Sequence, residues 1–386
     1  MVPSYLPATR YGGPIYSVHG LCKSLNALGH DVHVFTTNID GGGESDVPTG
    51  ISVNLDGVKV WYFRLAFPRR LYWSRSMARA LQEQTQCFDL VHLHSVFLWP
   101  TWAAARMARR AGVPYVLAPR GMLVEDLISR KSRLAKGLWI KLIERKNLEH
   151  AAAIHCTSDI EETECRALDL KLPRLVVIPN GAEIGRDLTF AASPRSDIRR
   201  VIERQPLILF LGRISWKKGL DRLIPALQRI PEACLAIAGN DDEDYSYEVI
   251  TLAERSGVAN RITLLGAVSG VDKAALYQHA KVFVLTSYSE NFGNAALEAL
   301  TYKCPVIITP EVGVASTIEQ AGAGRVVDGK PEKIAEAIKT ILDDDQLRTN
   351  MGLAGARLIQ EKYQWDKVAQ QMEAEYQLHI SSRYSQ

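Results

Sequence analysis

The chain alternates short apolar runs with stretches whose apolar residues recur at helical spacing. The runs are rich in Val, Ile and Leu, which is typical of strands covered on both faces of a parallel sheet. Strands that alternate with helices in this way predict an α/β protein built from doubly wound parallel sheets. The predicted strands cover residues 31–36, 58–63, 90–94, 113–118, 153–157, 175–178, 207–211, 233–238, 262–265, 282–286 and 306–309.

The helical patterns fill most of the intervals between these strands. Residues 40–57 are rich in Gly and Asp and are expected to form an exposed loop. Met1–Tyr5 has the residues expected at the end of a buried strand. A full first strand of such an α/β chain would begin several residues earlier. The predicted helices cover residues 18–28, 68–86, 127–150, 220–230, 247–256, 271–279, 331–343, 345–361 and 365–380.

Length and composition bound the class of protein. The 386 residues are enough for two domains, and 47% hydrophobic with 23% charged residues is the balance of a globular protein. The net charge of +3 is too small to indicate a nucleic-acid-binding protein. Residues 1–185 carry 22 Lys and Arg against 17 Asp and Glu, or +5, and the remainder carries 24 against 26, or −2. The first half is therefore expected to face any anionic surface or carrier.

The six cysteines are scattered, and no two have Cys-x-x-Cys spacing. This pattern predicts reduced thiols in a cytoplasmic protein, without a zinc site or a disulfide framework. The first residues lack the apolar segment of a signal peptide. No run approaches the roughly 20 apolar residues that a membrane-spanning helix needs.

The stretch from Ser287 to Pro310 carries the most specific chemistry. It predicts a strand end, a tight polar turn, a helix that begins near Asn294, and a second strand. The helix N-terminus would point backbone N–H groups at the strand ends, where phosphate binds well. Glu290 and Glu298 would accept hydrogen bonds from hydroxyl groups beside that phosphate, as in a nucleotide sugar. Two glutamates alone are also compatible with a helix-dipole contact and a solvated helix face.

Two cations form a second candidate site. Arg213 and Lys218 follow the predicted strand 207–211, in a turn with glycines on both sides. A guanidinium group can bind two phosphate oxygens at once and an ammonium group adds a point charge, so the pair suits a diphosphate. A solvated turn is the alternative for two cations at this spacing.

Gly12 and Gly13 stand at the first predicted turn between a strand and a helix. Glycines at this place let the backbone approach a diphosphate closely. The stretch is not Gly-x-Gly-x-x-Gly, so it is a weak signal for a nicotinamide cofactor, and a plain turn is the alternative.

The sequence from Ser289 to Leu300, followed by Pro305-Val-Ile, resembles the signature of family 4 glycosyltransferases. These are retaining enzymes with the GT-B fold, in which two Rossmann-like doubly wound parallel-sheet domains face each other across a cleft. Gly-Arg213 and Lys218-Gly match the same family, and Pro179-Asn-Gly181 resembles the turn where its chains pass between domains. The resemblance implies an acceptor-side domain at 1–185, a donor domain at 186–364, and a final helix at 365–386 that packs back on the first domain.

The resemblance also implies roles for single residues. Arg213 and Lys218 would hold the donor diphosphate and stabilise the charge that develops as it leaves, and Glu290 would contact hydroxyls of the donor sugar. Glu298 would bind the ribose diol. Asn291 stands where the family more often has glycine. The other residues that the resemblance places at the donor are Gly12, Gly13, Val268, Asn291, Phe292, Gly293, Asn294 and Ala295.

Two residues at strand ends of the first domain are further candidates. His94 ends the strand 90–94, and the family often has a histidine here near the acceptor, although a core histidine is the alternative. Arg120 follows the strand 113–118 where many members have histidine. We expect its permanent charge to anchor the diphosphate or an acidic acceptor, with a surface ion pair as the alternative.

Residues 127–150 carry seven Lys and Arg and two Glu among apolar residues. They predict a basic amphipathic helix, which either has an ordinary solvated face or, over 130–146, contacts anionic lipid or a lipid-linked acceptor at the inner face of the membrane. The acidic runs 241–244 and 343–345 have ligands that Mg²⁺ accepts, but both lie in polar loops. Because Arg213 and Lys218 would already neutralise the diphosphate, no metal and no other cofactor is expected.

These expectations converge on a metal-independent retaining glycosyltransferase. The resemblance implies transfer of a hexose from a UDP-sugar, with UDP-glucose as the first candidate. The acceptor would be a cell-surface or exopolysaccharide glycan, or a lipid-linked one. A nucleotide-sugar epimerase of the same architecture and a nucleotide-sugar-binding protein without turnover are the alternatives.

Overall fold

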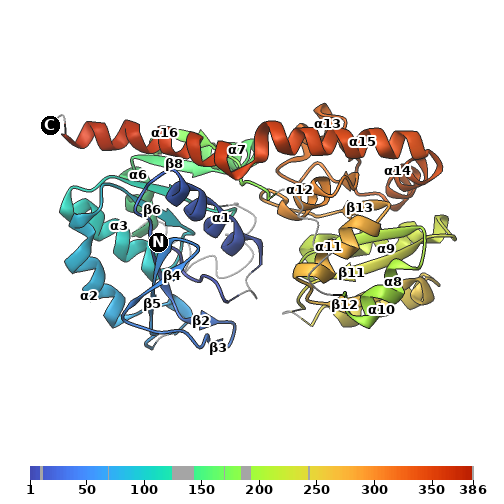
Figure 1. The fold of residues 1–386 in the computed structure, drawn as a ribbon, viewed down its shortest axis with the longest axis horizontal. Helices are drawn as coiled ribbons and strands as arrows, with labels where there is room; N and C mark the ends of the chain where they lie inside the picture. Colours follow the sequence, from blue (N-terminus) through green and yellow to red (C-terminus); the bar gives the residue numbers. More distant parts are fainter. Residues whose placement is uncertain are drawn as a thin grey trace. The chain divides into compact units, whose positions relative to one another are not determined.

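The computed structural model describes residues 1–8, 12–67, 69–123, 143–168, 170–183, 193–241 and 244–384. Its contacts divide the chain into two units (Figure 1). Unit 1 holds Met1–Gly181 and Trp365–Gln386, and unit 2 holds Ala182–Gln364. The chain therefore leaves unit 1, builds unit 2 and returns to unit 1 with its last helix.

The described strands of unit 1 form three sheets. A parallel sheet has the order β6-β7-β8-β9, a second sheet has the order β1-β5-β4 with an antiparallel edge, and β2 pairs with β3. The segment 40–57, expected as a loop, therefore contains short strands that the Gly and Asp turns connect. The bounds are β1 His33–Thr37, β2 Ile39–Asp40, β3 Gly43–Glu44, β4 Ser52–Leu55, β5 Val58–Phe63, β6 Val91–His94, β7 Tyr115–Ala118, β8 Ala153–Cys156 and β9 Leu175–Val177.

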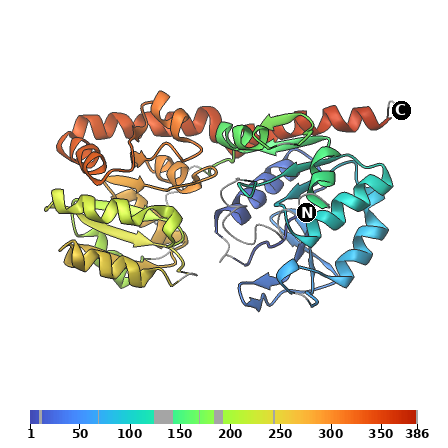
Figure 2. The same cartoon turned by 180° about the vertical axis from the view of Figure 1, so that it is seen from behind.

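Two helices of unit 1, α2 and α7, begin at serine caps. Ser74 and Ser158 accept hydrogen bonds from N–H groups in the first turns of α2 and α7. The last helix, α16, lies beside α1, and Figure 2 shows β8, α7 and β9 in front of it. The bounds are α1 Gly13–Ala27, η2 Arg69–Leu71, α2 Arg75–Gln84, η3 Thr85–Cys87, α3 Trp99–Ala111, α6 Arg145–Glu149, α7 Asp159–Arg166 and α16 Trp365–Tyr384.

Trp365 fixes the start of α16 in unit 1. Its indole ring lies against Gly20 of α1 and against Gly181 at the end of the first segment. A Cβ at either glycine would lie 2.4 Å from a ring atom. Both positions therefore require glycine, and the last helix is an integral part of unit 1.

The first residues connect two sheets of unit 1. Val2 N–H donates to the Phe35 carbonyl of β1 at 3.1 Å, and His94 N–H of β6 donates to the Met1 carbonyl at 3.0 Å. Met1–Pro3 is therefore extended backbone between β1 and β6, although it forms no assigned strand. A cavity of about 600 Å³ lies beside it, lined by residues of both strands and of neighbouring helices.

Unit 2 contains a parallel sheet of six strands in the order β12-β11-β10-β13-β14-β15. The chain moves outward from β10 to β12 and then returns to the other side of β10 with β13. In open parallel sheets, ligands bind outside the carboxyl ends of the two strands where the order reverses, here β10 and β13. The bounds are β10 Leu207–Leu211, β11 Cys234–Ala238, β12 Ile262–Gly266, β13 Val282–Leu285, β14 Val306–Ile308 and β15 Gly324–Val326.

The two acidic runs start helices of unit 2. The Asp241 carboxylate accepts from Tyr245 N–H and Ser246 N–H, both at 2.8 Å, and the Asp344 carboxylate accepts from Leu347 N–H at 2.8 Å. Such caps satisfy N–H groups that the first turn of a helix leaves open. The bounds are α8 Ser196–Ile202, η5 Trp216–Lys218, α9 Leu220–Ala226, η6 Leu227–Arg229, α10 Ser246–Arg255, η7 Ala259–Arg261, α11 Gly270–His279, α12 Asn294–Thr301, α13 Ala315–Gln320, α14 Pro331–Asp343, α15 Asp345–Leu358 and the π-turn η8 Ile359–Tyr363.

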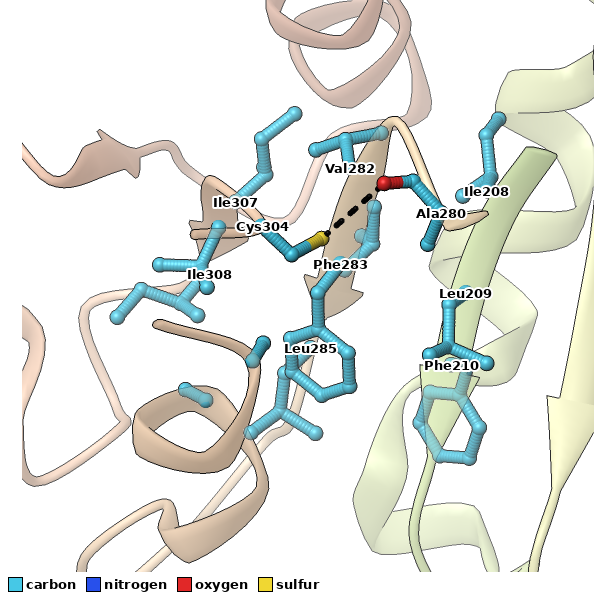
Figure 3. Close-up of a cluster of buried hydrophobic side chains, with 14 of the residues drawn as sticks. Ile208, Leu209, Phe210, Ala280, Val282, Phe283, Leu285, Cys304, Ile307 and Ile308 are labelled. Atoms are coloured by element: carbon cyan, nitrogen blue, oxygen red, sulfur yellow. Dashed lines mark hydrogen bonds between the residues drawn. The ribbon is translucent and has the colours of Figure 1, made fainter. Parts of the chain in front are cut away.

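The core of unit 2 holds β10 and β13 in place (Figure 3). Phe210 of β10 and Phe283 and Leu285 of β13 are buried there, and each such side chain stabilises the fold by about 1.5–3 kcal/mol. The buried thiol of Cys304 donates to the Ala280 carbonyl at 3.6 Å. In the part of the chain that the structure describes, no helix is long and apolar enough to cross a membrane.

Candidate active site

The loop after β10 lies at the reversal point of the unit 2 sheet. It carries Arg213, and Lys218 ends its short helix η5. Gly219 follows with a φ of 65°, and a Cβ there would lie 1.9 Å from the Thr286 carbonyl oxygen. Thr286 Oγ1 in turn donates to the Gly219 carbonyl at 2.7 Å. Glycine is therefore what allows this loop to pack against the end of β13.

That packing places Lys218 beside Glu290. Lys218 Nζ donates a hydrogen bond to Glu290 Oε2. Only 17% of the Lys218 side chain and 21% of the Glu290 side chain are exposed, so water screens this ion pair weakly. The Glu290 backbone is fixed by bonds to both sides of the loop after β14, from its N–H to Glu311 O and from Gly313 N–H to its carbonyl. A cation and a carboxylate thus stand together at the reversal point.

Arg213 is the exposed cation of the same loop. Its neighbour Ile214 donates through N–H to Asn240 O at 2.8 Å, which fixes the backbone. Lys218 Cε lies 3.6 Å from the position that a Cβ of Gly212 would take, directly before Arg213. Within the described ranges, no hydrogen bond or ion pair engages the Arg213 guanidinium. Its donors are therefore available to a ligand.

The start of α12 completes the donor-side arrangement. Gly293 precedes the helix with a φ of 104°, and a Cβ there would lie 2.7 Å from Val312 Cγ1. Asn294 and Ala295 form the first turn, where a helix carries its positive end and suits a phosphate. Phe292 is buried against Tyr363, with ring centroids 6.1 Å apart, so it can offer a ligand only its backbone.

Asn291 and Val268 are the two remaining donor-side candidates. Asn291 is half-buried in the turn directly after Glu290. Val268 lies between β12 and α11, half-buried against the core of unit 2. Their contribution to a ligand site stays a prediction.

Glu298 projects from α12 toward α11. Its Oε2 accepts from Lys273 Nζ and from Tyr277 OH, each at 3.1 Å. Burial, followed by the Glu298 charge, raises the pKa of Tyr277 well above its ordinary value, so the phenol keeps its proton and donates. About one third of the Glu298 side chain is exposed, which leaves its carboxylate accessible. Sequence reasoning missed Lys273 and Tyr277, whose only signal is their spacing of one helical turn on α11.

In unit 1, Gly12 and Gly13 lie at the start of α1. Gly12 has a φ of 74°, and Pro14 occupies the first turn, where its missing N–H costs nothing. Among the described residues, and leaving aside the two chain neighbours, no heavy atom lies within 4 Å of the position that a Cβ of Gly12 would take. The backbone is therefore open at this point, as close approach of a ligand requires. Residues 9–11 lie outside the described part.

His94 and Arg120 meet at the carboxyl ends of β6 and β7. His94 Nδ1 accepts from Arg120 Nε at 3.3 Å, and Arg120 NH1 donates to Asn180 Oδ1 at 2.7 Å. Burial, followed by the charges of His92 and Arg120, holds the pKa of His94 well below its ordinary value. His94 is therefore neutral, and its Nδ1 orients the guanidinium. Within the described residues, Arg120 forms no ion pair with a carboxylate, unlike the surface alternative.

Behind His94 lies a polar network that sequence reasoning missed. Tyr376 OH of α16 is 2.6 Å from His92 Nδ1, and His155 Nδ1 is 3.3 Å from His92 Nε2. Burial, followed by the Arg120 charge, lowers the pKa of His155 to about 3. The network links β6, β8 and α16 through neutral groups. None of these groups carries a negative charge that would compensate the positive charge of Arg120.

Most of the predicted basic helix falls outside the described residues. Positions 124–142 are among those that the structure does not describe, and α6 at Arg145–Glu149 is the described helix that follows. The predicted membrane contact of 130–146 therefore stays a prediction.

Two family models match the chain in sequence order. A "Glycosyl transferase 4-like domain" matches residues 12–181, and "Glycosyl transferases group 1" matches residues 195–357. Together they span both units and every candidate residue described above. The chain belongs to the group 1 glycosyltransferases. It is an enzyme of this family, and the predicted family and enzyme class are confirmed.

Relatives and solved structures agree with the family. An uncharacterized glycosyltransferase of Methanocaldococcus jannaschii is 28% identical over 96% of this chain and 95% of its own. Sucrose-phosphate synthase from Thermosynechococcus elongatus superimposes with a TM-score of 0.77 at 20% identity, covering 99% of both chains. Anabaena HepE in complex with UDP-glucose superimposes with a TM-score of 0.74 at 18% identity, covering 97% and 98%. These likenesses confirm the predicted GT-B fold of this glycosyltransferase.

Proposed function

We propose that this glycosyltransferase moves a hexose from a nucleotide-diphosphate sugar with retention of configuration and without a metal ion. UDP-glucose is the first candidate donor, and a cell-surface or exopolysaccharide glycan or a lipid-linked acceptor receives the sugar. The observation that carries this proposal is the Lys218–Glu290 pair at the ends of β10 and β13, with Arg213 in the same loop.

The two cations act on the diphosphate. Arg213 offers a planar guanidinium whose donors bind no group of the described residues, and Lys218 can turn from Glu290 to a phosphate oxygen. As the bond between the anomeric carbon and the phosphate oxygen breaks, negative charge develops on that oxygen. Two cations held on this loop would stabilise that charge, and the same cations would remove the need for a metal.

The two glutamates recognise the hydroxyl groups on either side of the diphosphate. Glu290, next to Lys218, would accept from hydroxyls of the donor sugar. Glu298, eight residues later on α12, would accept from the ribose diol, with Lys273 and Tyr277 holding its carboxylate in place. The start of α12 lies between the two glutamates in sequence and would bind the diphosphate.

Retention follows from displacement on the face from which the diphosphate leaves. The acceptor oxygen bonds to the anomeric carbon as the phosphate oxygen departs, and the hydroxyl proton passes to that phosphate oxygen. This step needs no enzyme nucleophile. His94, neutral and occupied with Arg120, would orient the acceptor side rather than take the proton. Arg120 would anchor the diphosphate or an acidic acceptor.

UDP-glucose is favoured as donor because Anabaena HepE, one of the similar structures, is a complex with UDP-glucose. The test is a thermal-shift panel of UDP, GDP and ADP sugars, followed by transfer assays with the best donor. We expect UDP-glucose to give the largest shift, and NMR to show the α-anomer in the product. Full activity in excess EDTA is expected, and activity restored only by Mg²⁺ or Mn²⁺ would contradict the metal-independent part.

An epimerase of the same architecture would also bind the donor. Incubation with the UDP-sugar in the absence of acceptor distinguishes the two reactions. The transferase gives slow hydrolysis at most, whereas an epimerase gives a new UDP-sugar. Appearance of an epimer at the rate of turnover would contradict the proposed reaction.

A further inference from the structure

Unit 1 contains a long segment with charges of one sign. From Gly57 to Gln82 there is no Asp or Glu, and six basic residues fall within it. The segment runs from β5 through η2 into α2 (Figure 1). The basic residues are Lys59, Arg64, Arg69, Arg70, Arg75 and Arg79.

Large apolar side chains are exposed in the same region. Phe67 is 89% exposed and Leu71 37% exposed, and both lie in the loop between β5 and α2. Ile51, 61% exposed, directly precedes β4, whose residue Ser52 pairs with Trp61 of β5. An exposed Phe and an exposed Leu in one connection gain little from the fold of unit 1, so these side chains point to something outside it.

The loop is held firmly at its base. Ala66 N–H donates to Trp73 O at 2.8 Å, and Leu65 N–H donates to Asn38 Oδ1 at 3.3 Å. Arg69 donates to the Glu44 carboxylate and to the Gly43 carbonyl, each at 3.0 Å. These bonds fix the described residues on both sides of Phe67, which itself stays outside the core.

Three other arginines of the segment are also exposed. In the portion of the chain that the structure describes, Arg64, Arg70 and Arg75 form no ion pair, and all three are exposed. Arg75 also occupies the first turn of α2, which contains no acidic residue, so its charge opposes the positive end of the helix dipole. Neither feature stabilises unit 1, which indicates that the charges serve an external anion.

We propose that this loop docks unit 1 on an anionic lipid surface. Phe67 and Leu71 enter the boundary between head groups and acyl chains, while Arg64, Arg70 and Arg75 bind lipid phosphates. Aliphatic Leu71, in the same connection as Phe67, suits acyl chains better than nucleic-acid bases, which stack on flat rings. The surface differs from the segment 130–146. Docking at this surface is compatible with the proposed lipid-linked acceptor. The docking surface follows from the loop residues alone and does not depend on that acceptor.

The test is co-sedimentation of the full chain with vesicles of phosphatidylcholine, with and without phosphatidylserine. We expect binding to the anionic vesicles at low salt and release as salt rises, because the attraction is screened. The triple variant R64Q/R70Q/R75Q should bind about a hundredfold more weakly, since each arginine contributes to attraction. Phe67→Ser should weaken binding about tenfold through lost apolar insertion.

Matched controls come from unit 2. Tyr247 is an aromatic residue that is 76% exposed, and Tyr247→Ser should bind as the wild type. The triple variant R199Q/R200Q/R255Q removes the same charge from exposed positions and should also retain binding. UDP affinity, measured on every variant, should be unchanged. A protein that binds these vesicles through the loop but transfers no sugar would contradict the proposed function and leave this surface standing.

Several outcomes would overturn the proposal. Equal binding to neutral and anionic vesicles would exclude the arginines, and wild-type binding by both loop variants would exclude the loop. Loss of binding only when basic positions of 130–146 are replaced would assign the contact to that segment. Binding of single-stranded or duplex DNA in preference to anionic vesicles would make the loop a nucleic-acid surface instead.

Discussion

Lys218 donates a hydrogen bond to the carboxylate of Glu290, 72 residues later in the chain. The pair joins the loop after β10 to the loop after β13, at the reversal point of the sheet. Each group neutralises the other in a site that water screens weakly. A donor that places phosphate at Lys218 and sugar hydroxyls at Glu290 would replace one ion pair by two sets of charge-assisted hydrogen bonds.

We expect Lys218→Ala and Arg213→Ala to reduce turnover far more than they reduce stability. Each substitution removes a cation that stabilises the developing negative charge. One such contact lowers the transition-state free energy by about 2–4 kcal/mol. Arg213 is exposed and makes no bond within the described chain, so its removal should leave the melting temperature unchanged. Steady-state kinetics and thermal melts measure this, with Arg255→Ala as the exposed control. Unchanged transfer by both variants would falsify the phosphate role.

The two glutamates should separate nucleotide binding from transfer. Glu298→Ala should weaken UDP binding, because the ribose belongs to UDP. Glu290→Ala should leave UDP binding nearly intact and abolish transfer, because the sugar is absent from UDP. Titration calorimetry with UDP measures both, and the exposed Glu319→Ala serves as control. Equal loss of UDP affinity in the two variants would show that this division of roles is wrong.

Tyr277→Phe should weaken UDP binding less than Glu298→Ala does. The phenol lies 3.1 Å from the Glu298 carboxylate and 3.2 Å from the Ala295 carbonyl, and both can accept its proton. The substitution removes the hydrogen bond to the charged group, worth about 1.5–3 kcal/mol. Part of the lost free energy should appear as a lower free energy of unfolding, because Tyr277 is fully buried. The comparison needs UDP affinity and unfolding free energy on the same variants. An unchanged UDP affinity would limit Tyr277 to a packing role.

Arg120→Lys should retain more activity at pH 8 than Arg120→His, because lysine keeps its charge there and histidine is mostly neutral. Neither variant should reach the wild type, since only the guanidinium fork can meet both His94 and Asn180. The ratio of the two activities across pH is the measurement. A fully active histidine variant at pH 8 would mean that charge is not what this position supplies.

The stability of the fold should fall as pH falls below about 6.5. The pKa of His155 is about 3 in the fold, against about 6.5 unfolded, so between these values the unfolded chain binds a proton that the folded chain does not. Stability is therefore complete above the unfolded pKa and declines toward the folded one. Urea unfolding at pH 7 and pH 5 tests this. For His155→Gln, the free energy of unfolding should fall less between the two pH values than it does for the wild type. A larger fall in the variant would contradict the role given to His155.

Sequence periodicity predicted the strands that are long and apolar, and it failed where an element is short. β15 has three residues and α13 has six, so neither shows a full period of apolar positions. The helix α3 was also missed, because its alanines and arginines give only a weak apolar stripe. β4 was not predicted either, because it lies in a Gly- and Asp-rich stretch and an exposed edge strand needs few hydrophobic residues.

Among the site residues, too, those with a local sequence signal were predicted and those without one were missed. Arg213, Lys218, Glu290 and Glu298 were found because each lies in a short motif beside an apolar run. Lys273 and Tyr277 carry no motif, and only the packing of α11 on α12 brings them to Glu298. The contact between Arg120 and Asn180 joins residues 60 apart at the ends of different strands, which no local pattern encodes.

Trp365, packed against Gly20 and Gly181, has a consequence for the order of folding during synthesis. Unit 2 is one continuous segment, Ala182–Gln364, and can fold as soon as that segment has left the ribosome. Unit 1 emerges first, yet its packing is incomplete until Trp365 and α16 arrive, nearly two hundred residues later. The half of the protein that is made first is therefore the half that finishes last. Until then its apolar face toward α16 stays open to chaperones and to aggregation.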